Sequence, residues 1–234
     1  MRLFITGVGS GLGKALVLEA LERGYEVFAL SRRLPAELEG RIHFTPCDLR
    51  DFERIPLTLK KLLDSSDYLD LVILNAGVLG RFGDMREIPL RSFEEVMKVN
   101  LWANKVILDT LSDLGIGVGQ LIGISSGAAV NCNRGWNAYA ISKAALNCLL
   151  KLYAREMEKT HVIALAPGLV LTPMLEEVMR QDEERFPSVR RIKESPKRTP
   201  EEAARLIFQL LPRLREFESG SFVDIRKLSQ APTS

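Results

Sequence analysis

Short apolar runs alternate with longer amphipathic segments along nearly the whole chain of 234 residues. The short runs predict strands at 2–6, 25–30, 41–44, 68–74, 119–124, 161–166 and 221–225. The longer segments predict helices at 12–23, 51–65, 91–112, 137–158, 174–184 and 199–212. Because strands that alternate with helices form parallel βαβ units, we expect an α/β fold, a doubly wound parallel sheet of about seven strands with helices on both faces.

No repeat, low-complexity tract or linker divides the chain, so residues 1–234 are expected to form a single domain. The last predicted helix has a clear start, with Thr199 as N-cap, Pro200 in the first helical position and Glu202 in the third. Hydrophobic residues at 46% and charged residues at 26% are ordinary for a globular protein. The net charge of 32 − 30 = +2 gives no reason to expect a nucleic-acid partner, although a local basic site stays open.

The three cysteines, Cys47, Cys132 and Cys148, cannot all pair within one chain and lack the spacing of metal ligands. Reduced thiols are the simplest interpretation, and they indicate a cytoplasmic protein without a bound metal. Neither a signal segment nor an apolar run of about 18 residues occurs, so we expect no leader and no contact with a membrane.

A glycine-rich stretch, Thr6-Gly7-Val8-Gly9-Ser10-Gly11-Leu12-Gly13, joins the first strand to the first helix. Glycine lets the backbone turn tightly and approach a pyrophosphate, which the free N–H groups and dipole of a helix N-terminus attract. The spacing departs from G-x-G-x-x-G, which would require a glycine at Leu12. A turn of this kind can be purely structural, but its position between strand and helix favours a dinucleotide ligand.

Tyr139 and Lys143 lie four residues apart in the helix expected at 137–158. Positions i and i+4 share one face of a helix, so the ammonium can lie beside the phenol and favour its ionised form. Ser126, thirteen residues before the tyrosine, follows a predicted strand and can hold a carbonyl oxygen beside the phenol. The three residues predict a proton donor for a ketone, although a Tyr-Lys pair alone also fits a surface helix.

Taken together, these features resemble the short-chain dehydrogenase/reductase family, in its short single-domain branch, over nearly the whole chain. Further motifs occur in the order of the family: Cys47-Asp48-Leu49, Asn75-Ala76-Gly77, Asn100, Ile124-Ser125-Ser126 and Pro167-Gly168. Leu74 departs from the pattern, since the family usually has an asparagine there, and a sheet-stabilising hydrogen bond is expected to be missing. The resemblance implies a Rossmann-type fold and an oxidoreductase that moves hydride between a nicotinamide cofactor and a small carbonyl compound or alcohol.

The resemblance also implies a role for each matched residue. Tyr139 would give a proton to the substrate oxygen, Lys143 would lower the phenol pKa and bind the nicotinamide ribose, and Ser126 rather than Ser125 would hold the carbonyl. Asn100 would bend its helix and hold a water for a proton relay to Lys143, although an asparagine in a helix can also make only a local bond.

Contacts with the cofactor are implied along the same motifs. Asp48 would accept a hydrogen bond from the adenine amino group, with Leu49 beside the ring. Thr172 would bind the carboxamide of nicotinamide. The remaining contacts are expected from Gly7, Gly9, Ser10, Gly11, Leu12, Gly13, Asn75, Ala76, Gly77, Tyr139, Lys143, Pro167, Gly168 and Val170.

Ser31, Arg32 and Arg33 follow the second predicted strand, where an NAD-selective site usually has a carboxylate for the ribose 2′-OH. Guanidinium groups can instead bind a 2′-phosphate through charge-assisted hydrogen bonds. NADP(H) is therefore expected in preference to NAD(H), with Arg32 the better candidate, unless both arginines are merely solvated loop residues.

Residues around 169–198 are expected to form a lid over the substrate, because an apolar edge at 169–175 precedes the charged run 180–185, although a plain surface helix fits the same pattern. Trp136, Met174 and Val130 favour an apolar or aromatic ketone or aldehyde, although apolar pocket walls are the rule. Two alternatives stay open. One is a non-catalytic sensor or scaffold protein on the same fold, and the other is a relative of the nucleotide-sugar epimerases, which generally have a longer C-terminal substrate region.

The helix at 137–158 carries apolar or small residues on more than one face, whereas covering a sheet requires a single apolar stripe. We therefore expect a homodimer or homotetramer joined through this helix and the one at 91–112, unless the loops of a single domain cover the extra apolar surface. The family resemblance implies the same pair of helices, with Trp102, Val106 and Leu149 as interface residues.

Overall fold

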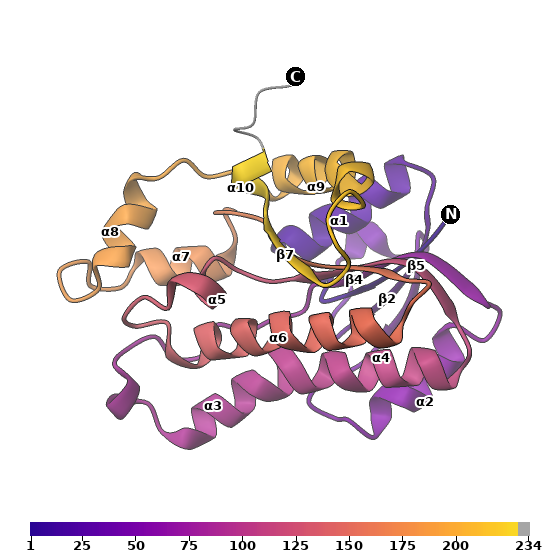
Figure 1. Cartoon of the computed structure of the whole chain (residues 1–234), viewed down its shortest axis with the longest axis horizontal. Coiled ribbons are helices and arrows are strands. Elements are labelled where there is room, and N and C mark those ends of the chain that lie inside the picture. The colour runs from indigo at the N-terminus through magenta and orange to yellow at the C-terminus, as the bar shows by residue number, and fades with distance from the viewer. Residues whose placement is uncertain (229–234) are drawn as a thin grey trace.

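The computed structural model describes residues 1–228 and confirms the α/β fold (Figure 1). Within this range seven parallel strands form one sheet in the order β3-β2-β1-β4-β5-β6-β7. The strands are β1 (Arg2–Thr6), β2 (Glu26–Ser31), β3 (His43–Pro46), β4 (Tyr68–Leu74), β5 (Gly117–Ile124), β6 (His161–Ala166) and β7 (Ser221–Asp224). Residues 229–234 of the expected domain lie outside the described residues.

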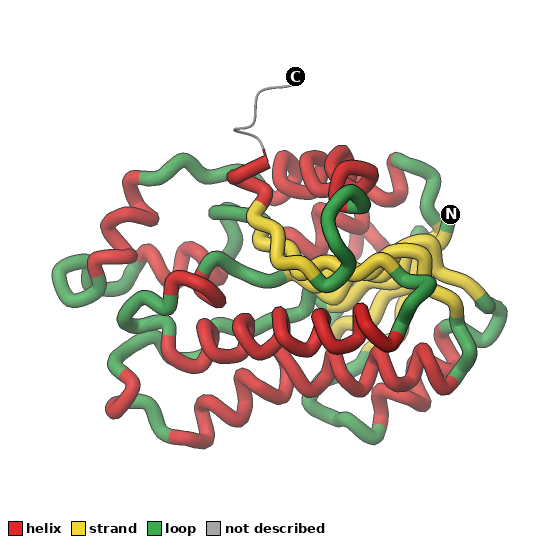
Figure 2. The backbone as a smooth tube through the Cα atoms, viewed as in Figure 1, coloured by secondary structure: helices red, strands yellow, loops and turns green. Residues whose placement is uncertain are grey.

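Helices cover both faces of the sheet, which lies between them in Figure 2. One face packs against α1 (Gly11–Glu22) and α9 (Pro200–Leu214) through a core that includes Leu16 and Phe208. The other face packs against α2 (Arg54–Leu62), α4 (Ala103–Asp113) and α6 (Asn137–Glu156), where Ile107 and Leu150 are fully buried. The remaining α-helices of the described range are α3 (Leu90–Met97), α5 (Ala128–Asn131), α7 (Pro173–Met179), α8 (Pro187–Glu194) and α10 (Ile225–Leu228).

The order of the strands determines where a ligand can bind. The chain begins in the middle of the sheet, adds β2 and β3 on one side of β1, and then crosses to β4 on its other side. The loops after β1 and β4 therefore leave neighbouring strands in opposite directions. Such a switch point opens a crevice at the carboxyl ends of the strands, where open α/β sheets bind their ligands.

The helix expected at 91–112 is interrupted. It consists of α3, a π-helical turn η3 (Lys98–Trp102) and α4. Asn100 lies inside this turn, which agrees with the expected local bend at that residue. A π-helical turn accommodates one extra residue and often occurs at functional sites.

The helix expected at 174–184 ends earlier, because α7 stops at Met179. Asp182 then forms a local turn, in which its Oδ1 accepts hydrogen bonds from the backbone N–H groups of Glu184 and Arg185 at 2.9 and 3.1 Å. Such a side chain competes with continuation of a helix. Helix α8, which the sequence pattern missed, starts with Pro187 in its first turn.

The start of α9 agrees with the prediction. Thr199 Oγ1 accepts a hydrogen bond from the N–H group of Glu202 at 3.1 Å, and Glu202 Oε2 accepts one from the N–H group of Thr199 at 2.8 Å.

Candidate active site

The glycine-rich turn lies at the switch point and leads into α1. Gly7 has a φ of +75°, and a Cβ atom on Gly13 would lie 2.0 Å from the Gly7 carbonyl oxygen, so no other residue fits there. Ser10 makes no side-chain cap on α1. The N–H groups of the first turn therefore remain available to an anion.

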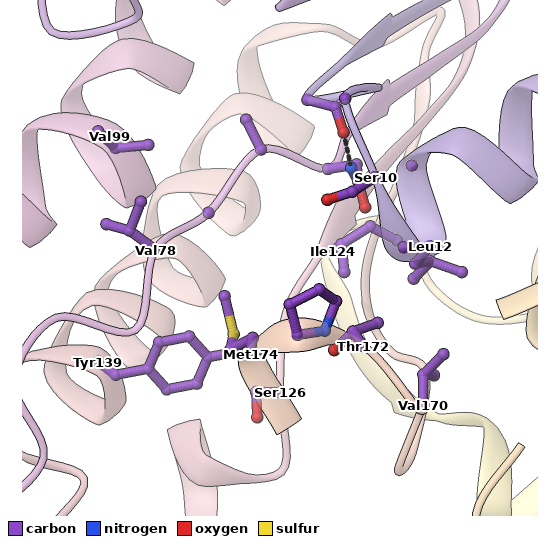
Figure 3. A pocket seen from close by; sticks show the side chains of 18 of the residues that line it. Ser10, Leu12, Val78, Val99, Ile124, Ser126, Tyr139, Val170, Thr172 and Met174 are labelled. Carbon is purple, nitrogen blue, oxygen red and sulfur yellow. Dashed lines mark hydrogen bonds between the residues drawn. The ribbon is translucent and has the colours of Figure 1, made fainter. Parts of the chain in front are cut away.

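A cavity of about 480 Å³ begins at this turn and extends past the ends of β4, β5 and β6 (Figure 3). Its walls bring together nearly all the residues that the sequence predicts for the cofactor and the chemistry. Those lining it are Gly7, Gly9, Ser10, Gly11, Leu12, Gly13, Ser31, Arg32, Asp48, Leu49, Asn75, Ala76, Gly77, Ser126, Tyr139, Lys143, Pro167, Gly168, Val170 and Thr172. Arg33 is exposed and does not line the cavity.

Asn75 fixes the loops on the two sides of the switch point. Its Nδ2 donates to the carbonyl oxygens of Thr6 and Gly7 at 3.1 and 2.9 Å. Thr6 Oγ1 accepts hydrogen bonds from the N–H groups of Asn75 and Ala76, both at 3.1 Å. Leu74, the departure from the family pattern, points instead into the apolar core below α4 and α6.

Asn100 is completely buried and links the loop after β4 to α6. Its Oδ1 accepts a hydrogen bond from Val78 N at 2.8 Å, and its Nδ2 donates to Val78 O and Ser142 Oγ, both at 2.9 Å. The side chain therefore makes long-range contacts rather than only a local bond. Its backbone oxygen accepts a hydrogen bond from Asn104 Nδ2 at 2.9 Å, a contact that sequence reasoning missed. The water relay through Asn100 stays a prediction.

Ser126, Tyr139 and Lys143 meet at one end of the cavity, where Figure 3 shows the Tyr139 ring and Ser126 near Met174. Ser126 Oγ accepts a hydrogen bond from Ala128 N at 3.1 Å and lies close enough to the Tyr139 phenol to lower its pKa. Ser125 instead contacts Asn147 Oδ1 at 2.5 Å. Lys143 Nζ donates to the carbonyl oxygen of Ile124 at 2.7 Å and lies 5.8 Å from the centre of the Tyr139 ring.

Burial controls the titration of the two buried groups. It raises the pKa of Tyr139, and the hydrogen bond with Ser126 opposes this rise only in part. Burial also lowers the pKa of Lys143 from 10.5 to about 8. Without a bound cofactor the ammonium is directed at Ile124 O and burial dominates the phenol, so the lowering of the Tyr139 pKa by Lys143 stays a prediction for the cofactor-bound protein.

At the opposite end of the cavity, Arg50 holds the Asp48 carboxylate in a two-pronged contact. Arg50 Nε lies 3.0 Å from Asp48 Oδ1, and Arg50 Nη2 lies 2.5 Å from Asp48 Oδ2. These hydrogen bonds lower the pKa of Asp48 to about 2, with a further contribution from the nearby charge of Arg32. Sequence reasoning missed Arg50, and its position two residues after Asp48 was the available signal.

Leu169, Met174 and Val178 of the segment 169–198 line the cavity, and backbone hydrogen bonds join the two ends of the segment at its base. Arg198 N donates to Leu169 O at 3.0 Å, and Leu171 N donates to Arg198 O at 2.9 Å. Thr172 caps α7 at this base, where its Oγ1 accepts a hydrogen bond from Leu175 N at 3.3 Å.

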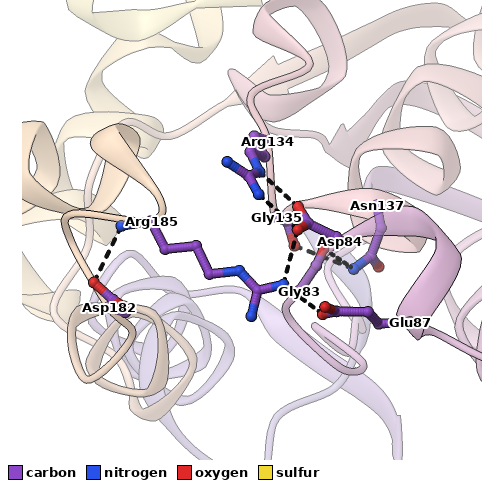
Figure 4. A network of polar contacts seen from close by, with 8 residues as sticks. All are labelled: Gly83, Asp84, Glu87, Arg134, Gly135, Asn137, Asp182 and Arg185. Carbon is purple, nitrogen blue, oxygen red and sulfur yellow. Dashed lines mark hydrogen bonds and ion pairs between the residues drawn. The ribbon is translucent and has the colours of Figure 1, made fainter.

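Ion pairs hold the far end of this segment to the rest of the chain (Figure 4). Arg185, just before α8, contacts Asp84 Oδ2 at 2.8 Å and Glu87 Oε2 at 2.6 Å. Arg134 binds the same Asp84 carboxylate through Nε and Nη2 at 2.6 and 2.7 Å. Hydrogen bonds from Arg134 and Arg185 hold the pKa of Asp84 well below its ordinary value.

Aromatic rings form the wall beside Tyr139. Trp136 lies 5.7 Å from the Tyr139 ring, and Phe82 makes edge contacts with Trp136 at 5.5 Å and with Phe186 at 5.0 Å, measured between ring centres. Asn137 anchors this corner, with Nδ2 donating to the carbonyl oxygens of Arg81 and Gly83 at 2.9 and 3.1 Å. No motif singled out Asn137 in the sequence. Val130, proposed for the same wall, is exposed and lines neither cavity that the structure describes.

Cys47 is buried, Cys132 and Cys148 are exposed, and all three are free thiols. Among residues 1–228 no group of three or more His, Cys, Asp or Glu side chains is placed to hold a metal ion. The same part of the chain contains no helix with the length and apolar character needed to span a membrane.

Comparisons with known proteins agree with this geometry. A family model described as short chain dehydrogenase matches residues 2–183. Over 97% of its length the chain is 30% identical to a benzil reductase ((S)-benzoin forming) of Bacillus subtilis, covering 99% of that protein. It is 26% identical to an NADPH-dependent pterin aldehyde reductase of Arabidopsis thaliana, over 74% of this chain and 76% of that one. The crystal structure of the KRED1-Pglu enzyme superposes with a TM-score of 0.84 at 25% identity, covering 95% of this chain and all of that one.

A doubly wound sheet with this constellation at its switch point defines a Rossmann-type oxidoreductase. The chain belongs to the short-chain dehydrogenase/reductase family, which confirms the resemblance found in the sequence.

Proposed function

We propose that the chain is an NADPH-dependent reductase that converts a small ketone or aldehyde into an alcohol, or catalyses the reverse reaction. The observation that carries this proposal is the cavity itself, which has Ser126, Tyr139 and Lys143 at one end and the glycine-rich turn and Arg32 at the other. A cofactor that spans the cavity would place its reactive ring beside the phenol. The names of the benzil and pterin aldehyde reductases support carbonyl chemistry.

Each residue at the catalytic end has a chemical task in this proposal. Ser126 holds the substrate carbonyl by a hydrogen bond, and Tyr139 donates its proton to the same oxygen as general acid. Lys143 binds the ribose hydroxyls and, when protonated, favours the phenolate that remains. Bound NADPH would supply the hydride. Asn100 fixes α6 relative to the loop that contains Gly77 and so maintains this geometry.

The preference for NADPH rests on charge. Ser31 stands where a carboxylate would bind the 2′-OH of NADH, and Arg32 lines the same end of the cavity. Neither Arg32 nor Arg33 forms an ion pair with another residue in the described range, so both guanidinium groups can bind a 2′-phosphate. Arg32 is the better placed, because Arg33 lies outside the lining.

The substrate would lie between the catalytic residues and the segment 169–198, which we propose acts as a lid. Trp136, Met174, Leu175 and Val178 give this space an apolar and partly aromatic wall. An aromatic ketone fits that surface, and the benzil reductase of Bacillus subtilis supports the same class.

We also propose that the chain forms a homodimer or homotetramer through α4 and α6, which lie side by side in Figure 1. Trp102, Ile141 and Leu152 on and beside these helices are 44–53% exposed, and the half-buried Val106 and Leu149 also belong to the two helices. Large apolar side chains that gather on one surface are typical of an interface.

The function is tested by following NADPH absorbance with a panel of aromatic diketones, aryl ketones and aldehydes. We expect turnover with at least one aryl ketone and a higher kcat/KM with NADPH than with NADH. Saturable NADPH binding without turnover of any carbonyl would instead support a non-catalytic sensor. A clear preference for NADH would contradict the proposed role of Arg32.

A further inference from the structure

A second cavity of about 440 Å³ adjoins the catalytic residues, and the reaction proposed above leaves it unused. It shares Ser126, Trp136, Gly168 and Leu169 with the cavity of about 480 Å³ described above, so it opens onto the place where a substrate carbonyl would lie. Its other walls come from α5, α8 and the start of α10. The polar side chains beyond Ser126 are Asn131, Asn133, Ser188, Arg191, Ser195 and Arg226.

Among the described residues, the lining of this cavity contains two arginines and no acidic residue. Arg226 is held in place from outside the lining by Asp224, with Nε 2.9 Å from Oδ1 and Nη2 2.5 Å from Oδ2. The Asp224 side chain is only 7% exposed, so this pair positions the arginine and balances its charge.

Arg226 extends along the carboxyl ends of β5 and β6. A Cβ atom on Gly168 would lie 3.2 Å from Arg226 Cγ, and one on Gly127 would lie 3.1 Å from Arg226 Nη2. Gly127 directly follows Ser126 in the chain. The guanidinium group therefore lies beside the residue proposed to hold the substrate carbonyl.

Arg191 supplies a charge that no carboxylate within residues 1–228 pairs with. Its Nη2 donates to the neutral side-chain oxygen of Asn133 at 2.9 Å, and it forms no ion pair with any residue of the described range 1–228. Its neighbours differ, since Arg185 is paired with Asp84 and Glu87, and Arg190 contacts Glu184 at 3.8 Å. With Arg226 balanced by Asp224, the cavity keeps one uncompensated positive charge.

We propose that this second cavity binds a carboxylate of the substrate, so that the preferred substrate is a keto acid or a carboxylated aldehyde. The inference deepens the proposed function and rests on it. The carbonyl would lie at Ser126 and Tyr139, the apolar body against Trp136, and the carboxylate at Arg191 with Arg226 beside it. A planar guanidinium fork matches a carboxylate in two-pronged geometry, and the adjacent serine and asparagine side chains can complete its hydrogen bonds.

The test compares aryl keto acids with their methyl esters: phenylglyoxylate and 4-oxo-4-phenylbutanoate, each against its ester. The measured quantity is the ratio of kcat/KM for the acid to kcat/KM for the ester, with NADPH in excess. We expect the wild type to favour at least one acid. The substitution Arg191→Gln should lower that ratio about 10-fold or more, the effect expected from loss of one charge-assisted hydrogen bond.

Arg190→Gln is the matched control, because Arg190 lies on the same helix, is exposed and does not line the cavity. It should leave the ratio unchanged. A wild type that prefers both esters, or an unchanged ratio in Arg191→Gln, would overturn the inference while leaving the reductase proposal intact.

If the reductase proposal is wrong, the result differs: NADPH is oxidised with neither the acids nor the esters. Binding then decides the inference, since Trp136 lines the cavity and Trp102 is the one other tryptophan of the chain. In a Trp102→Phe background, the keto acid is added and the fluorescence of Trp136 is measured. Saturable quenching that becomes weaker in Arg191→Gln would support the carboxylate site. No quenching, or equal quenching with and without Arg191, would refute it.

Discussion

Replacing Lys143 by methionine should stabilise the cofactor-free protein while abolishing turnover. The lysine is 3% exposed, and burial lowers its pKa from 10.5 to about 8. This difference corresponds to roughly 3 kcal/mol of folding free energy at neutral pH, at about 1.4 kcal/mol per pKa unit. The charge-assisted hydrogen bond to Ile124 O contributes about 1.5 kcal/mol in the opposite direction. The net gain for Lys143→Met is about 1.5 kcal/mol, or roughly 3–6 °C in Tm for a chain of this length.

The stability gain of Lys143→Met depends on pH, and the direction of this dependence follows from the folded and unfolded pKa values of Lys143. Below the folded pKa of about 8 the amine is protonated in both states, so the penalty of burying its charge is complete. Between that pH and 10.5 only the unfolded chain remains protonated, so wild-type stability rises with pH and the advantage of the variant falls. Above 10.5 the advantage is gone.

Urea unfolding of the cofactor-free wild type and variant, at about pH 7 and about pH 10, measures this difference. The nearby Tyr139 phenol also titrates at alkaline pH, so the same pair is compared in a Tyr139→Phe background. A gain that is equal at both pH values, or a variant less stable than the wild type at neutral pH, would refute the buried-charge reasoning.

Three further results are expected. Tyr139→Phe should reduce kcat by about 10²-fold or more with little change in NADPH affinity, because only the transferable proton is removed; more than about a tenth of wild-type kcat would exclude Tyr139 as the acid. Arg32→Ala should lower the kcat/KM preference for NADPH over NADH by about 1.5–3 kcal/mol, whereas Arg33→Ala, which alters a residue outside the cavity, should change it less. Light scattering at micromolar concentration should give two or four times the chain mass of 26.2 kDa, and a mass equal to one chain would refute the oligomer.

The parts of the site that depend on local spacing could be predicted from the sequence. Tyr139 and Lys143 share a helix face, and the glycine-rich turn follows its strand directly, so their placement follows from chain geometry alone. Asn100 could be placed at a bend, but the contacts of its side chain with Val78 and Ser142 depend on the packing of two elements far apart in the chain.

Features that arise from tertiary contacts could not be predicted from the sequence. The pKa of Tyr139 rises because the folded chain buries it, which no spacing reveals. Helix α8 was missed because the charged run before it looks like a continuation of α7 until Asp182 turns the backbone. Arg191 and Arg226 reach one cavity from different elements, so the sequence held no pattern that joined them.

The closed base of segment 169–198 has a consequence for how substrate preference changes among relatives. Its ends are joined by two backbone hydrogen bonds between Leu169, Leu171 and Arg198, which involve no side chain of the catalytic set. We expect that the residues between these ends can be exchanged as one unit. Their sequence and length can vary without moving the strand ends that carry Ser126 and Gly168. We expect that grafting this segment from another reductase transfers substrate choice, provided that the graft retains an arginine to dock on Asp84.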